Sequence, residues 1–236
     1  MAIPAALLAA ERIGTRAAWI AAAAAVALSA VVAWPGVVNQ NDLDARSVNG
    51  VPAAGVALAI GLTLVAAARV GTSLAPRQPA DRRRLAAAIF LFLFGLPWTA
   101  ADLGFSFDGV PLLGSIWESG ELRHQPGLPG LHPALHHGHH HGMDGILVAV
   151  SALVLSRTPS RMRPGLISAY LALLVAYGIG NIANDFWLEQ IAKRGWTAWL
   201  IPSVLNPAVS WAWAVIVGGA VLAWALLFRP RPTARP

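Results

Sequence analysis

Six long apolar runs, separated by short polar segments, dominate the pattern of residues along the chain. They cover residues 17–38, 51–70, 85–103, 137–155, 166–186 and 205–228. An α-helix needs about 20 apolar residues to cross a bilayer, and every backbone amide inside lipid must find a partner within its own segment. The runs are rich in Ala and Leu and lack the alternation of barrel strands. The pattern therefore predicts an all-α, polytopic integral membrane bundle of about six helices, with residues 1–236 forming a single membrane domain.

Arginine is distributed unequally between the segments that join these runs. Thirteen of the 17 basic residues lie on one side of the predicted bundle, in segments within 12–16, 69–84, 157–163 and 229–235. The segments on the opposite side hold only Arg46, Arg123, Lys193 and Arg194. Basic residues accumulate on the cytoplasmic side of membrane proteins. We therefore expect both termini to be cytoplasmic. Nine of the eleven acidic residues fall on the other, extracytoplasmic face, which suits the attraction of cations.

Tryptophan and glycine add two expectations about the helices. Six tryptophans fall near the predicted outer boundary, where an aromatic belt would place them. They are Trp34, Trp98, Trp117, Trp187, Trp196 and Trp199. The small residues in 55–61 and 178–180 favour close helix packing.

The longest connection covers residues 104–136 and is rich in Gly, Pro and His. It falls on the extracytoplasmic side and is too apolar for a plain solvated linker. We expect it to lie against the mouth of the bundle, with a short interfacial helix around residues 113–122.

Composition narrows the chemistry and the partners. Hydrophobic residues make up 56% of the chain, and cysteine is absent, which excludes disulfides and thiolate metal sites. The basic residues sit between apolar runs and form no water-exposed patch, so we expect no nucleic-acid partner. The lipid bilayer is the expected partner, with other membrane subunits as a further candidate. Abundant Ala, Arg and Gly with a single Lys suggest a GC-rich bacterial genome and hence the plasma (inner) membrane.

Six of the seven histidines lie in the stretch LHPALHHGHHHGMDG, residues 131–145. The apolar part of this span, residues 143–155, is only thirteen residues long and cannot cross ~30 Å of hydrocarbon at ~1.5 Å per residue. The helix must then begin near His136 or His137, and Pro133 suits the first position of such a helix. The histidines would form its outer turns.

The spacing of these residues is that of metal ligands on one helix face. His136 and His140 are four apart, as are His137 and His141, and Asp144 lies four after His140. Imidazoles at i and i+4 can hold one divalent ion, with a carboxylate as a further ligand or as the group that orients a histidine. We therefore predict a transition-metal site, copper or zinc as first choice. Its candidate ligands are His132, His136, His137, His139, His140, His141 and Asp144.

A loose metal-collecting tract and a helix end without a metal stay open as alternatives. A transmembrane haem is not expected, because bis-histidine ligation needs imidazoles on two helices.

Polar residues in the other spans lie at the same predicted depth as the histidines, near the outer boundary, and are candidates for supporting roles. They are Asp102, Asn181, Asn184, Asp185 and Asn206. Polar groups within spans usually face the bundle interior, and interhelical hydrogen bonding is the alternative role for the asparagines.

Three functions are compatible with this pattern. The first is a membrane protein that holds a divalent metal at its extracytoplasmic face, for metal acquisition, storage or delivery. The second is a membrane-embedded metalloenzyme that uses the same residues on a lipid-soluble substrate. The third is a non-catalytic accessory subunit that docks through an apolar patch of the outer loop, formed by Phe105, Phe107, Leu112, Leu113, Ile116 and Trp117.

Overall fold

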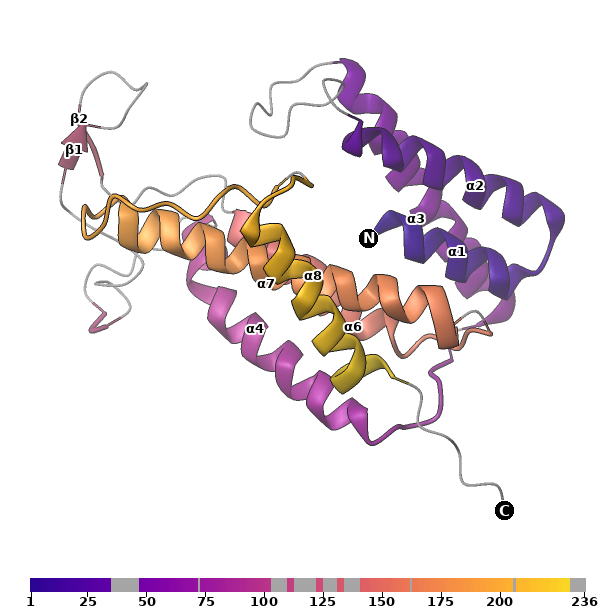
Figure 1. Ribbon diagram of the computed structural model, residues 1–236. Coiled ribbons are helices and arrows are strands. Elements are labelled where there is room, and N and C mark those ends of the chain that lie inside the picture. The colour runs from indigo at the N-terminus through magenta and orange to yellow at the C-terminus, as the bar shows by residue number, and fades with distance from the viewer. Residues whose placement is uncertain are drawn as a thin grey trace.

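Helices make up almost all of the regular structure. The computed structural model of the chain describes residues 1–34, 47–71, 73–102, 110–112, 122–124, 131–133, 141–161, 163–205 and 207–229. The helices are α1 (Ala2–Ile13), α2 (Arg16–Ala30), α3 (Gly50–Val70), α4 (Ala80–Asp102), α6 (His141–Leu155), α7 (Ser168–Phe186) and α8 (Trp211–Ala223) (Figure 1). Short 3-10 turns lie at η1 (Val31–Ala33) and η2 (Ser47–Asn49), and π-helical segments at η3 (Arg163–Ile167), η4 (Trp187–Ala192) and η5 (Trp224–Phe228). Two three-residue strands, β1 (Leu122–His124) and β2 (Leu131–Pro133), pair antiparallel.

Five helical segments are long and apolar enough to cross a membrane. They are Arg16–Ala33, Gly50–Val70, Ala80–Ala100, Gly165–Ala192 and Trp211–Phe228. The apolar helix Gly142–Leu155 is shorter. The chain is therefore a multi-pass helical membrane protein, and the prediction of a helical membrane bundle is confirmed.

The helices form two groups that are joined at one end (Figure 1). In the first, α1 and α2 pack on α3 around a core of small side chains such as Ala10, Ala22 and Ala59. In the second, α7 is central: half of its spanning window is buried, against 17–28% for the other four spans. We call the end with Arg16, Val70 and Ser168 the inner end, and the end with Asp102, His141 and Trp211 the outer end, after the predicted orientation.

Helix α1 was not anticipated from the sequence. Its twelve residues are too few to cross a bilayer, and Gly14 ends it with a φ of 72° and an N–H that donates to Ala10 O. Thr15 then caps α2 by accepting a hydrogen bond from Ala18 N, so α1 and α2 form an antiparallel hairpin. Arg12 Nη2 donates to Gly71 O at 2.6 Å and ties the hairpin to the inner end of α3.

The expected helix start at Pro133 is wrong. Pro133 lies in β2, opposite Leu122 of β1, and His132 lies opposite Arg123. A residue before proline avoids the α region, which is the physical reason that His132 adopts extended backbone. His132 therefore does not share a helix face with the histidines that follow it. The structure describes residues 141–155 of the expected span 137–155.

Helices α6 and α7 cross with their backbones in direct contact. A Cβ added at Gly145 would lie 2.5 Å from Gly178 O, and one at Gly178 would lie 2.3 Å from Gly145 O. Small residues permit such an approach in membrane helices. The packing role expected for Gly55, Gly178 and Gly180 is confirmed, since a Cβ at each would meet a neighbouring helix within 3 Å; Gly61 has nothing within 4 Å, so the expectation was wrong there.

We predict that Gly178→Ala lowers the stability of the bundle in detergent by about 1–3 kcal/mol, because the added methyl group forces α6 and α7 apart. The measurement is the apparent Tm, followed by the loss of helical circular dichroism. Gly218→Ala is the matched control, because a Cβ at Gly218 has nothing within 4 Å. Equal Tm values for the two variants would contradict the direct backbone contact.

Candidate functional site at the outer end of the bundle

Asp185 of α7 is buried against the first turn of α6. Its side chain is only 4% exposed. A Cβ added at Gly142 would lie 2.9 Å from Asp185 Oδ2, so the missing side chain of Gly142 lets the carboxylate approach the α6 backbone. Gly142 directly follows His141, the first residue of α6. The structure therefore places this carboxylate beside the residue where the histidine-rich stretch enters the helix.

Trp98 of α4 also lies against Gly142, at the start of α6. The indole is 2% exposed, and a Cβ at Gly142 would lie 2.4 Å from its ring. Its ring packs edge-on against Phe94 at 5.9 Å, and Phe94 meets Phe186 of α7 at 5.7 Å. The placement of Trp98 in an aromatic belt is therefore wrong, because the side chain fills the space between α4, α6 and α7. Trp34, Trp196 and Trp199 are exposed at the outer end, as a belt would require.

The polar residues of α7 separate onto two sides of the helix. Asn181 is buried beside Gly145, and its Nδ2 donates to Tyr177 O at 2.9 Å. Asn184 instead turns to the segment between α7 and α8, where its Nδ2 lies 3.2 Å from Ile201 O and 3.3 Å from Pro202 O. Asn181 and Asp185 thus face α6, whereas Asn184 anchors the connection to α8.

Asp144, the carboxylate predicted to lie among the metal ligands, is exposed on α6. Gly142, Gly145 and Ala149 form the side of α6 that meets α7 or α4. The two candidate carboxylates therefore occupy different environments: Asp185 is enclosed by the bundle, and Asp144 is open to its surroundings.

The remaining predicted site residues are described only in part. His132 lies in β2, His141 begins α6 and Asp102 ends α4, each described by its backbone. The residues that lie outside the described part of the chain include His136, His137, His139, His140 and Asn206, and all of the apolar outer-loop residues except Leu112. Residues 113–121 of the interfacial helix expected around 113–122 also lie outside it, and Leu122 belongs to β1. Within the part of the chain that the structure describes, no group of three or more His, Asp or Glu side chains is close enough to hold a metal ion.

A second polar cluster at the outer end was missed by the sequence analysis. Glu189 and Gln190 in η4 are buried, and Lys193 Nζ lies 2.6 Å from Glu189 Oε1. A Glu followed four residues later by a Lys is the helical ion-pair spacing, and it was the pattern that could have revealed this contact.

The fold and this polar outer end together define a class: a multi-pass helical membrane protein with a carboxylate, Asp185, buried at the outer end of its bundle. No protein-family model, curated protein or solved structure matches the chain.

We predict that Asn184→Ala destabilises the connection between α7 and α8 by about 1–3 kcal/mol, because two backbone carbonyls lose their donor. Limited proteolysis of the detergent-solubilised protein should cut residues 196–210 faster than in the unmodified chain. Ser203→Ala is the control, since its Oγ accepts only a long 3.4 Å contact from Leu205 N. Equal cleavage rates in the two variants would exclude this role for Asn184.

Proposed function

We propose that this protein holds a divalent transition metal at the extracytoplasmic mouth of its bundle, in the plasma membrane, for metal acquisition, storage or delivery. The proposed ligands are His136, His137, His139, His140 and His141, with Asp144 as a further ligand. Asp185 is the buried carboxylate that orients one of these ligands or completes the ligand set. The observation that carries the proposal is the placement of Asp185 Oδ2 against Gly142, one residue after His141.

The energetics of a buried carboxylate support this proposal. Moving an ionised carboxylate out of water is costly unless positive charge lies nearby. The first turn of α6 supplies positive charge through N–H groups that have no partner within the helix, equivalent to about half an elementary charge. A metal ion bound by the imidazoles that precede this turn would add positive charge at the same place. Asp185 would then stabilise both the ion and the tautomer of its nearest histidine.

The available ligand types limit the metal. Without cysteine, nitrogen and oxygen ligands favour zinc, copper(II), nickel or iron over copper(I), and copper or zinc remains the first choice. The acidic bias of the outer face supports capture of cations from the extracytoplasmic side.

The first test is the metal content of detergent-purified protein, prepared with a tag that needs no nickel resin and measured by elemental mass spectrometry. We expect a near-stoichiometric metal that is lost when His136, His137, His139, His140 and His141 are all changed to Ala. His124→Ala is the control, because His124 lies in β1 and outside the proposed ligand set. No bound metal after resupply, or equal metal in the five-histidine variant, would remove the proposal.

The second test separates the two carboxylates. Asp185→Asn should weaken metal affinity by about 10–100-fold, the usual effect of losing a group that orients a ligand. Asp144→Asn should also weaken binding if Asp144 ligates the ion directly, and Asn184→Ala should leave the affinity unchanged. Competition titration against a chelator of known affinity measures all three variants. An Asp185→Asn variant with unchanged affinity would leave the buried carboxylate with no part in metal binding.

A further inference from the structure

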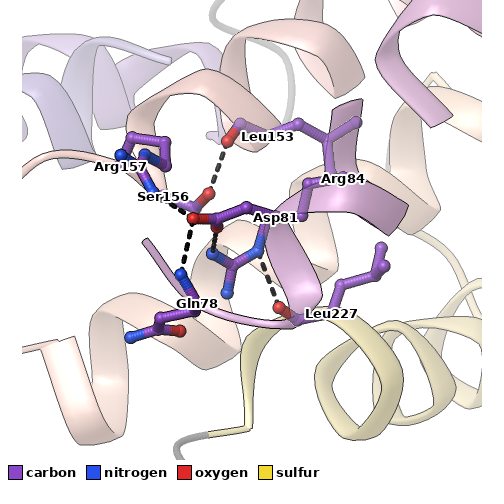
Figure 2. A network of polar contacts seen from close by, with 7 residues as sticks. All are labelled: Gln78, Asp81, Arg84, Leu153, Ser156, Arg157 and Leu227. Atoms are coloured by element: carbon purple, nitrogen blue, oxygen red, sulfur yellow. Dashed lines mark hydrogen bonds and ion pairs between the residues drawn. The ribbon is translucent and has the colours of Figure 1, made fainter. Parts of the chain in front are cut away.

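A polar network ties together three segments at the inner end, remote from the outer polar site. The carboxylate of Asp81, in the first turn of α4, accepts hydrogen bonds from Gln78 N at 2.9 Å, from Arg84 Nη1 at 2.7 Å and from Arg157 Nη1 (Figure 2). Ala75 N also donates to Arg157 O at 2.7 Å. The segment that enters α4 is thereby fixed against the inner end of α6.

Arg84 has a structural role in this network. It is 5% exposed, its Nε donates to Leu227 O at 2.7 Å, and its guanidinium carbon lies 5.4 Å from the centre of the Phe228 ring. Its guanidinium therefore joins α4 to the inner end of the last helix, as Figure 2 shows for Leu227.

A cavity of about 860 Å³ lies beside the network, with an excess of positive charge on its walls. Four arginines line it, Arg77, Arg82, Arg84 and Arg157, together with one carboxylate, Asp81. Four positive charges against one negative charge leave a net charge of +3. Asp81 is shared by Arg84 and Arg157, while Arg77 and Arg82 are exposed and form no ion pair with any described residue. The cavity therefore presents two guanidinium groups to an incoming anion.

Most of the rest of the cavity wall is apolar. Leu85 and Val154 line it, and they are 62% and 60% exposed on the outer surface of the apolar helices α4 and α6. Ala88 and Leu153 continue this wall. An inorganic anion would use only the arginines, whereas a molecule with a charged head and a hydrocarbon tail matches both the arginines and the apolar part of the lining.

We propose that this cavity binds an anionic phospholipid of the cytoplasmic leaflet, with the headgroup phosphate between Arg77 and Arg82 and an acyl chain along Leu85 and Val154. Guanidinium groups bind phosphate oxygens through paired hydrogen bonds. Basic pockets between membrane helices on the cytoplasmic side suit such headgroups. The bound lipid would hold the inner ends of α4 and α6 at a fixed depth in the membrane.

The test uses the full chain in nanodiscs made of phosphatidylcholine and phosphatidylglycerol in equal amounts. The protein is extracted with detergent, washed, and its retained lipids are quantified by mass spectrometry. We expect phosphatidylglycerol to be enriched over phosphatidylcholine, and the double variant Arg77→Gln/Arg82→Gln to reduce that enrichment by at least about tenfold.

The matched control is Arg69→Gln/Arg83→Gln, which removes the same charge from exposed inner-end positions that do not line the cavity. It should retain the enrichment of the unmodified protein. Equal losses in the two double variants would reduce the effect to general surface charge and overturn the proposal, as would the absence of any enrichment in the unmodified protein. Inorganic phosphate added during the wash should leave the lipid in place, and its displacement of phosphatidylglycerol would assign the cavity to a soluble anion instead.

Discussion

The contact between Gly145 of α6 and Gly178 of α7 sets the geometry of the outer end. A Cβ added at either glycine would lie within 2.5 Å of the other's carbonyl oxygen, so the two backbones touch and a larger residue at either position would force the helices apart. From this crossing, one turn outward on α6 leads to Gly142, and the outer part of α7 leads to Asp185. The approach of Asp185 to the start of α6 is therefore a consequence of the glycine contact, and Trp98 fills the remaining space.

The two ends of the bundle use carboxylates in opposite ways. At the inner end, Glu11 accepts hydrogen bonds from Ser160 Oγ and Arg161 N, and Asp81 joins α4 to α6. Both inner acids therefore connect segments that are distant in sequence, and the surplus arginine stays available for lipid. At the outer end, Asp185 is enclosed by apolar helices. An ionisable group buried in this way marks the end of the bundle where polar chemistry is concentrated.

Hydrophobic periodicity and length were sufficient to locate the long helices, because an apolar run bounded by arginines has few alternatives in lipid. The expected runs 51–70 and 166–186 compare with Gly50–Val70 and Ser168–Phe186. Helix α1 has no counterpart among the predicted spans, since twelve residues fall below the length of a span and Gly14 separates them from α2. The helix start at Pro133 was wrong because the local preference of His132 for extended backbone prevails over the need for a longer span.

The composition of the candidate site was accessible from sequence, but the direction of each side chain was not. Asn184 and Asp185 are neighbours, yet helix rotation turns one toward Ile201 and the other toward Gly142, and only packing decides that rotation. Packing also separates Asp144, exposed on α6, from Asp185, buried on α7, with a chemical consequence for any metal held by the histidines. A ligand set completed by exposed Asp144 stays in contact with water and favours rapid exchange, which suits acquisition and delivery. A set completed by buried Asp185 is shielded, so each electrostatic contact is stronger and the ion is retained, which suits storage.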